Sequence, residues 1–248
     1  MKEMDTGLAQ DTTALILAGG KGTRIAALVP NLPKPMVEVA GQPFLEWVLR
    51  RLTREKIAEI VLSIGYKAEV VIQWMESRDM TPFPAKLRYL RENEPLGTGG
   101  AIAEALPSIA TPYVLILNGD TLLLADFLPA VGRMADEKLN GMILARTVED
   151  TGRYGRLRTE NGILKEFQEK QAGRGLINGG VYAFQTAWLK THLNAGISSF
   201  EIDVIPRLLK DGAKIGIEAT EAPFIDIGTP ETLAAAGDFV LKHKGCFS

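Results

Sequence analysis

The sequence predicts an α/β fold in which a mixed, mostly parallel β-sheet is flanked by helices. Short apolar runs of strand length alternate with segments whose apolar residues recur at helical spacing. Four such runs occupy residues 14–18, 60–64, 87–90 and 113–117. This alternation is typical of a parallel sheet with helical crossovers. In such sheets, ligands bind beyond the carboxyl ends of the strands.

The expected helices follow from apolar spacing and from start and stop signals. The first begins near Phe44, and its apolar positions continue through Trp47, Val48, Leu49 and Leu52. Further helices are expected around residues 70–75, 102–106, 127–135 and 200–209. Thr229 is a suitable N-cap for a last helix because Pro230 follows it at the first helical position.

Beyond residue 140 the pattern becomes richer in strands. Short extended pieces are expected at residues 141–145, 154–157, 163–167, 175–184, 215–217 and 224–227, with an earlier one at 36–39. Turn residues separate them, and no linker divides the chain into separate folding units. We therefore expect a β-rich extension of the same sheet.

Composition narrows the class of protein. The chain has 248 residues, of which 46% are hydrophobic and 23% charged, as in soluble globular proteins. A formal net charge of -2 gives no electrostatic reason to expect nucleic acid or an anionic membrane as a partner. A lone cysteine, Cys246, closes no internal disulfide, which fits a reducing compartment. The expectation is a cytoplasmic protein.

The sequence predicts no membrane-spanning segment and no N-terminal anchor. No apolar run approaches the roughly 18 residues that span a bilayer. Residues 1–12 are polar and carry Asp5 and Asp11, unlike a signal peptide. We expect this segment to be a disordered or frayed extension.

A glycine-rich loop follows the first predicted strand. Gly19, Gly20 and Gly22 allow the backbone to approach a ligand and to turn its N–H groups toward a phosphate. Arg24 and Lys34 add two cations. The spacing matches neither a P-loop nor a G-x-G-x-x-G fingerprint, and a plain tight connection is the alternative. The pattern favours a nucleoside triphosphate site.

A second glycine-rich loop, at residues 92–101, follows the third predicted strand and reaches the same edge of the sheet. Such a loop has little side-chain bulk and could lie flat against a planar base. The alternative is a helix N-terminus with Thr98 as N-cap. The two interpretations are compatible.

Asp120 follows the most apolar of the predicted strands, within Asn118-Gly119-Asp120. A carboxylate at the end of a buried strand is costly unless it is paired, hydrogen-bonded or bound to a metal. Mg²⁺ is bound through one or two carboxylates together with substrate phosphates. Asp120 is therefore a candidate metal ligand, with a turn-capping Asp as the alternative.

Taken together, these motifs resemble those of the sugar-1-phosphate nucleotidyltransferases. The resemblance covers residues from about Ala14 to Gly237 and is carried by LAGGKGTR, PKP, NGD, FQEK, NGGVYAF and FIDIGTPE. The segments PLGTGGAI, RYG, GLINGGVY and SFEIDVI are most similar to the D-glycero-α-D-manno-heptose 1-phosphate guanylyltransferases. Mannose-1-phosphate guanylyltransferases and N-acetylmuramate-1-phosphate uridylyltransferases share much of the pattern.

The resemblance implies a Rossmann-like (GT-A-like) fold whose β-rich extension binds sugar. It also implies that a sugar 1-phosphate and an NTP, with GTP favoured, give an NDP-sugar and pyrophosphate with Mg²⁺ as cofactor. Residues 13–248 would form one domain, with a nucleotide half at about 13–140 and a sugar-phosphate half at about 141–248. The oligomeric state stays open, with a homodimer among the options.

The resemblance also assigns site residues. Nucleotide-binding residues would be Leu17, Ala18, Gly19, Gly20, Gly22, Thr23, Glu94, Gly97, Thr98 and Gly99. Catalytic residues would be Arg24 at the leaving pyrophosphate, Lys34 near the α-phosphate, and Asp120. Sugar-phosphate-binding residues would be Gly155, Glu169, Lys170, Asn178 and Gly179. Asp120 and Asp226 would be the Mg²⁺ ligands.

Plainer interpretations stay open for some of these residues. Asp226 is also placed to cap the end of a strand, and Glu169-Lys170 to form a solvated pair. Glu201 is placed as a negative charge at the N-terminus of a predicted helix, although its match to the family also points to contact with the sugar. A non-catalytic sugar-nucleotide sensor is the alternative from another functional class.

Overall fold

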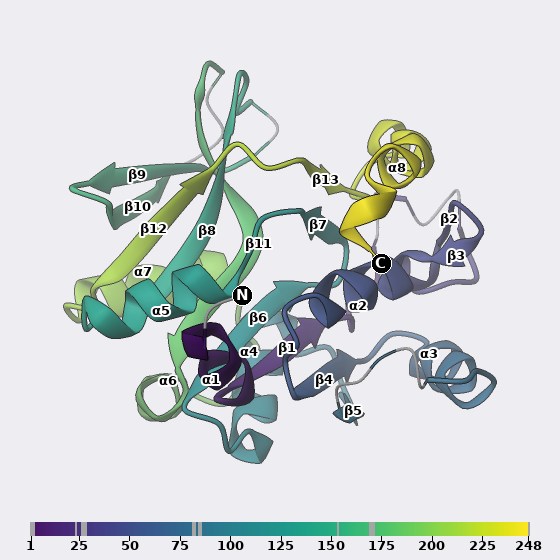
Figure 1. The fold of residues 1–248 in the computed structure, drawn as a ribbon, viewed down its shortest axis with the longest axis horizontal. Coiled ribbons are helices and arrows are strands. Elements are labelled where there is room, and N and C mark those ends of the chain that lie inside the picture. Colours follow the sequence, from purple (N-terminus) through teal and green to yellow (C-terminus); the bar gives the residue numbers. More distant parts are fainter. Residues whose placement is uncertain are drawn as a thin grey trace.

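The computed structural model describes residues 3–22, 24–25, 29–80, 83, 86–152, 154–168 and 172–247. These residues form a nine-stranded sheet in the order β5-β4-β1-β6-β11-β8-β12-β10-β9 (Figure 1). Smaller pairings join β2 to β3 and β13 to β7. The mixed α/β architecture predicted from the sequence is confirmed.

One half of the sheet is parallel. It contains β1 (Thr12–Leu17), β4 (Glu59–Ile64), β5 (Lys86–Arg91) and β6 (Tyr113–Asn118). Their side chains are mostly buried in β1, β4 and β6, whereas β5 is the exposed edge strand. Because the four strands run in one direction, their carboxyl ends meet at one edge of the sheet.

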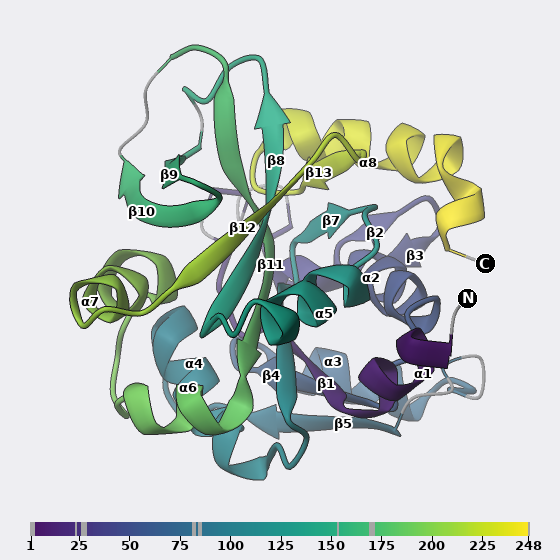
Figure 2. The same ribbon diagram turned by 60° about the vertical axis from the view of Figure 1, so that its left-hand side comes forward.

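The other half is mixed, as expected for the β-rich extension. The long strand β11 (Gly175–Gln185) runs antiparallel to β6 and to β8 (Gly141–Val148). Beyond β8 lie β12 (Ile215–Thr220), β10 (Ile163–Gln168) and β9 (Arg156–Glu160). Figure 2 shows β9 and β10 at the left of the view, away from α8.

Helices cover both faces of the sheet, and alternating strand residues form two cores. Ala14 and Ile16 point into the core with α2 (Phe44–Thr53), α3 (Ala68–Glu76), α5 (Leu128–Asp136) and α8 (Pro230–Lys242). Leu15 points into the opposite core with α4 (Gly97–Ala105), α6 (Thr186–His192) and α7 (Ile205–Lys210). This period of two is the side-chain alternation of a strand buried on both faces.

Short elements connect these layers. They are three 3₁₀ turns (Lys34–Met36, Leu106–Ser108 and Lys244–Cys246), a π-helical turn (Phe200–Val204) and the strands β2 (Glu38–Val39), β3 (Gln42–Pro43), β7 (Thr121–Leu123) and β13 (Phe224–Asp226). No helix among the described residues is long and apolar enough to cross a bilayer.

The N-terminal segment differs from its prediction. Residues Glu3–Gln10 form α1, which lies beside α5 (Figures 1 and 2). Ala9 is buried, and the Leu8 side chain packs against the main core. The prediction of a frayed extension is wrong for these residues, because the apolar side chains of Leu8 and Ala9 dock this eight-residue helix against the core.

Two further differences concern helices. The short helix α6 was not predicted, because its seven residues are too few for a periodic pattern. The single helix expected at residues 200–209 is instead a π-helical turn followed by α7. Pro206 lies at the start of α7 and lacks a backbone N–H, so a regular α-helical ladder cannot pass through it.

The predicted N-cap of α8 is confirmed, since Thr229 accepts a hydrogen bond from the Thr232 backbone.

Candidate active site

A cavity of about 460 Å³ lies at the carboxyl ends of the parallel strands. Residues within two positions of the ends of all four strands line it: Gly19, Gly65, Glu92 and Asp120. The remaining lining residues are Leu17, Gly20, Lys21, Tyr66, Asn93, Glu94, Pro95, Gly97, Thr98, Ala101 and Asn118. The sequence-predicted residues brought together here are Leu17, Gly19, Gly20, Glu94, Gly97, Thr98 and Asp120.

The glycine-rich loop is shaped by close contacts. A Cβ at Gly19 would lie 2.2 Å from Glu92 Oε1, so no larger residue fits without moving that carboxylate. Gly22 has φ +60°, and a Cβ there would lie 2.9 Å from the Lys34 Cβ. The buried Ala18 donates its backbone N–H to Ser63 at 2.8 Å, which ties the loop to β4. Arg24 is exposed and is not among the described cavity-lining residues, and Thr23 lies outside the described residues.

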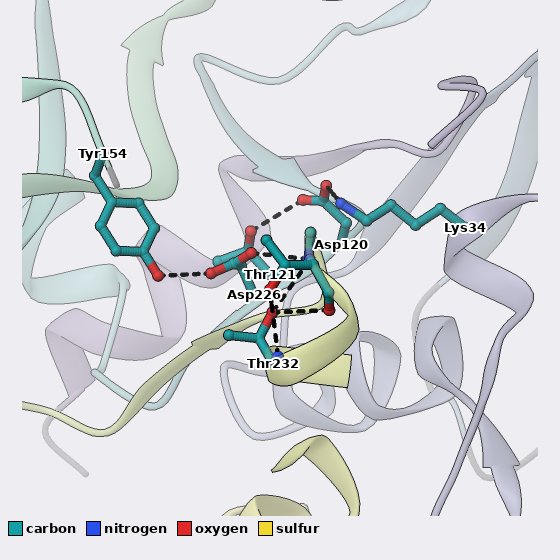
Figure 3. A network of polar contacts seen from close by, with 8 residues as sticks. Lys34, Asp120, Thr121, Tyr154, Asp226 and Thr232 are labelled. Atoms are coloured by element: carbon teal, nitrogen blue, oxygen red, sulfur yellow. Dashed lines mark hydrogen bonds and ion pairs between the residues drawn. The ribbon is translucent and has the colours of Figure 1, made fainter. Parts of the chain in front are cut away.

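Lys34 reaches the cavity-lining Asp120 from the 3₁₀ turn that follows the loop. Its ammonium forms an ion pair with Asp120 Oδ2 (Figure 3). The side chain of Lys34 is 13% exposed and that of Asp120 is 34% exposed. Asp120 Oδ1 accepts a hydrogen bond of 3.0 Å from the Thr121 hydroxyl. One carboxylate thus faces the cavity with a cation already beside it.

Asp226 is brought to Asp120 by the pairing of two short strands. β13 runs antiparallel to β7, so that Asp226 lies opposite Thr121, and the Ile227 N–H donates to the Asp120 carbonyl at 3.0 Å. A Cβ at Gly228 would lie 3.5 Å from Lys34 Nζ, which places this turn beside the ammonium. The two carboxylates predicted as metal ligands therefore reach the same edge of the sheet.

The Asp226 carboxylate is held on both sides. Its Oδ2 accepts a hydrogen bond of 2.7 Å from the Tyr154 hydroxyl, and its Oδ1 accepts one of 2.8 Å from the Gly228 N–H (Figure 3). The Gly228 bond is the turn cap that the sequence offered as an alternative. Capping and metal binding are compatible, because a carboxylate has about four acceptor positions.

Glu92 was not singled out from the sequence. It follows β5, lines the cavity and accepts a hydrogen bond of 2.9 Å from the Ser63 hydroxyl. Burial raises the pKa of Glu92, while hydrogen bonds from Ser63 and the Leu96 backbone act in the opposite direction. A charged residue directly after a predicted parallel strand was the available signal, and it is the same signal that pointed to Asp120.

The second glycine-rich loop packs against the segment that precedes α7. Gly97 has φ +70°, and a Cβ there would lie 2.5 Å from the Ser198 carbonyl oxygen. The buried Gly99 donates its N–H to the same oxygen at 2.8 Å. Thr98 is not the N-cap of α4, because the helix begins at Gly97. Its hydroxyl instead accepts from the Phe200 N–H at 2.8 Å and donates to Glu201 Oε2 at 3.1 Å.

Three of the predicted sugar-phosphate residues, Gly155, Asn178 and Gly179, are described by the structure and are not among the residues that line the cavity. Gly155 is exposed at the start of β9, and a Cβ there would only touch the Gln168 carbonyl, at 3.5 Å. Asn178 and Gly179 form an irregularity in β11, where the register with β8 shifts. Asn178 donates a hydrogen bond to the buried Tyr182 hydroxyl. Glu169 and Lys170 lie outside the described residues.

Comparison with known proteins identifies the family to which this chain belongs. Residues 13–243 match the family described as nucleotidyl transferase. The chain is 34% identical over 219 residues to the D-glycero-alpha-D-manno-heptose 1-phosphate guanylyltransferase of Aneurinibacillus thermoaerophilus, covering 88% of this chain and 94% of the relative. It is 32% identical to the mannose-1-phosphate guanylyltransferase of Mycobacterium tuberculosis, of which 61% is covered.

Solved structures of similar proteins support the same family assignment. The crystal structure of HddC from Yersinia pseudotuberculosis superposes with a TM-score of 0.82 at 33% identity, covering 91% of this chain and 98% of that chain. A complex of the same protein with GMP-PN gives a TM-score of 0.81 at 32% identity, with the same coverage. The family resemblance and the Rossmann-like fold predicted from the motifs are confirmed. The chain belongs to the nucleotidyl transferase family.

Proposed function

We propose that this protein condenses GTP with a sugar 1-phosphate to give a GDP-sugar and pyrophosphate, with D-glycero-α-D-manno-heptose 1-phosphate as the sugar substrate. The observation that carries the proposal is the meeting of a glycine-rich loop, Lys34 and two carboxylates at one sheet edge. Relatives named as heptose 1-phosphate guanylyltransferases, of which the chain covers 94% and 95%, support the sugar assignment.

The proposed reaction is an in-line attack of a sugar phosphate oxygen on the α-phosphorus of GTP, with pyrophosphate as leaving group. It requires charge neutralisation and alignment rather than a covalent enzyme intermediate. The loop at Gly19 and Gly20 offers backbone N–H groups to the phosphates. Lys34 would neutralise charge near the α-phosphate, and the exposed Arg24 would close on the departing pyrophosphate.

The two carboxylates fit Mg²⁺. This ion prefers oxygen ligands and is bound in enzymes through one or two carboxylates together with substrate phosphates. Asp120 and Asp226 provide such a pair, and no third Asp, Glu, His or Cys joins them among the described residues. Bound there, Mg²⁺ would neutralise the charge on the nucleotide phosphates. Tyr154 and Gly228 would orient Asp226 for this role.

Glu92 supports guanine as the base. Its Oε1 accepts a hydrogen bond from the Ser63 hydroxyl, and a carboxylate has about four acceptor positions, so it can also accept from a ligand. Guanine presents N1–H and N2–H₂ as neighbouring donors on one edge, a match for an acceptor-only carboxylate. Uracil presents a single N3–H between two carbonyl oxygens, which a carboxylate repels.

A substrate matrix tests the function. Pyrophosphate release is measured with four NTPs against heptose, mannose and N-acetylmuramate 1-phosphates in the presence of Mg²⁺. We expect turnover with GTP and heptose 1-phosphate to exceed every other pair. Preference for mannose 1-phosphate would correct the sugar, turnover only with UTP would overturn the guanylyl assignment, and no turnover would favour the sensor.

A substitution at Glu92 tests the assignment of guanine as the base. Glu92→Gln replaces one acceptor with a donor at constant size, so the preference for GTP over UTP should fall about 10- to 100-fold in kcat/KM. Glu69→Gln is the matched control, since Glu69 is an exposed carboxylate on α3 and is not among the described residues that line the cavity. An unchanged GTP preference in Glu92→Gln would remove Glu92 from base selection.

A further inference from the structure

A chain of hydrogen bonds connects the wall of the cavity to β11 through the interior of the protein. The Thr98 hydroxyl donates to Glu201 Oε2 at 3.1 Å, and the Tyr182 hydroxyl donates to Glu201 Oε1 at 2.7 Å. Asn178 in turn donates its side-chain amide to the Tyr182 oxygen. Four side chains from α4, the π-helical turn and β11 are thereby joined.

The centre of this chain is closed to solvent. Tyr182 is 0% exposed, and its ring packs edge-on against Phe200 with the ring centroids 5.3 Å apart. Burial and the adjacent Glu201 raise the pKa of Tyr182 well above its usual value. The phenol therefore stays protonated and donates to the carboxylate, so the direction of this hydrogen bond is fixed.

Glu201 has both oxygens engaged. Oε1 accepts from Tyr182, whereas Oε2 accepts from Thr98 and, at 3.3 Å, from the Ser199 hydroxyl. This use of two acceptors corrects the interpretation of Glu201 as a simple helix N-terminal charge. A shift of either partner must move the carboxylate and hence the other partner.

The two ends of the chain belong to different parts of the site. Thr98 lines the nucleotide cavity. Asn178 lies at the irregularity of β11, where its Oδ1 accepts the Gly180 N–H at 2.9 Å, and it is one of the predicted sugar-phosphate contacts. The Tyr182 hydroxyl thus lies between Glu201, which contacts Thr98, and Asn178.

We propose that Tyr182 and Glu201 are positioning residues that couple the nucleotide pocket to the sugar-phosphate pocket, so that a ligand in one tightens binding in the other. The inference rests on the proposed function, because Asn178 acts here as a sugar-phosphate contact. A ligand that fixes one end of the chain bears the ordering cost for the other end. Coupling of this kind is reciprocal and typically amounts to about 5- to 150-fold in affinity.

The test compares two dissociation constants. Binding of a non-hydrolysable GTP analogue is measured by calorimetry with and without saturating heptose 1-phosphate. The ratio should be about tenfold in the wild-type protein and should fall toward one in Tyr182→Phe, which lacks the hydroxyl. Glu201→Gln should also lose the coupling, because its amide cannot accept from both arms.

Asp203→Asn is the matched control. Asp203 lies on the same turn as Glu201, but its carboxylate accepts the Ser199 N–H at 2.7 Å and stabilises only the turn. This variant should lower the melting temperature while leaving the ratio at the wild-type value. If Tyr182→Phe fails to fold, Thr98→Val removes one arm at a half-buried position and should lower the ratio equally.

A wild-type ratio in folded Tyr182→Phe, or a ratio of one in the wild-type protein, would overturn the coupling. Pyrophosphate release measured on the same preparations keeps the two proposals apart. Turnover together with an unchanged ratio in Tyr182→Phe refutes the coupling alone. Absence of turnover in the wild-type protein refutes the proposed function, while the binding ratio still decides the coupling.

Discussion

The ammonium group of Lys34 is paired with the carboxylate of Asp120 at the edge of the cavity. The pair lies beside the turn that carries Asp226, so a cation already occupies the position between the glycine-rich loop and both carboxylates. A divalent ion that binds Asp120 must compete with this ammonium or displace it toward the substrate phosphates.

Lys34→Met should therefore raise the affinity of the nucleotide-free protein for Mn²⁺, used as a spectroscopic substitute for Mg²⁺. Losing one hydrogen bond to a charged group is worth about 1.5 kcal/mol, or about tenfold in affinity. Under the proposed function, the same variant should also lower kcat, because Lys34 would no longer neutralise charge near the α-phosphate. Lys21→Met is the control, since Lys21 lines the cavity and forms no ion pair with the residues that the structure describes. Unchanged Mn²⁺ affinity in Lys34→Met would show that the two cations do not compete.

Tyr154→Phe should weaken the dependence of the reaction on Mg²⁺. The hydroxyl of Tyr154 orients Asp226 Oδ2 through the 2.7 Å hydrogen bond, while its ring contacts Phe224 edge-on and would stay in place. Removing the partner of a metal-binding carboxylate typically costs about 10- to 100-fold in metal affinity or activity. The Mg²⁺ concentration at half-maximal rate should rise accordingly. Tyr89→Phe, on the exposed edge strand, should leave it unchanged.

The carboxyl of Glu92 should make stability depend on pH. Burial raises the pKa of Glu92 above the usual 4.5, so the folded protein holds this proton more tightly than the unfolded chain does. At a pH below the pKa of Glu92 in the unfolded chain, the protonated carboxyl contributes its full stabilisation to the fold. This contribution is lost as the pH rises through the pKa of Glu92 in the folded protein. Glu92→Gln lacks this titration, so its melting temperature relative to the wild type should be higher at about pH 7 than at about pH 4. A difference that does not vary with pH would contradict the assignment.

Glu55→Ala should destabilise the fold far more than a comparable surface change. The Glu55 carboxylate pairs with Arg51 at 2.7 Å and accepts the N–H groups of Phe127 and Leu128, both at 3.2 Å, at the start of α5. Both partners are 5% exposed, and removing one partner of a buried pair typically costs about 3–5 kcal/mol.

The control for this prediction is Glu166→Ala. The Arg158–Glu166 pair is half exposed, and such pairs are worth about 0–1 kcal/mol. Denaturant unfolding of both variants gives the comparison. Equal losses of unfolding free energy would contradict the role assigned to Glu55.

Much of the fold could be predicted from local patterns. The parallel strands are apolar runs of distinctive length, and the Thr229-Pro230 start of α8 is a local signal. Docking of α1 depends on what α5 offers to Leu8 and Ala9, which no local pattern reveals. Likewise, the π-helical turn before Pro206 packs against α4, which begins in the second glycine-rich loop, and no local pattern reveals this contact.

The candidate site was predictable where residues directly follow strands. Gly19 and Asp120 were found because the carboxyl ends of parallel strands meet, and Glu92 fits the same rule although it was overlooked. The partners of these residues were not predictable. The contact of Tyr154 with Asp226 and that of Thr98 with Glu201 join distant segments whose approach depends on the tertiary structure.

The central claim is that Asp120 and Asp226 act together in Mg²⁺-dependent guanylyl transfer. Its most direct test is pyrophosphate release from GTP and heptose 1-phosphate by the wild-type protein, by Asp120→Asn and by Asp226→Asn, with melting temperatures recorded. We predict rapid release by the wild-type protein and a loss of about 10²- to 10⁴-fold in each folded variant. Near-wild-type release by either variant would contradict the claim.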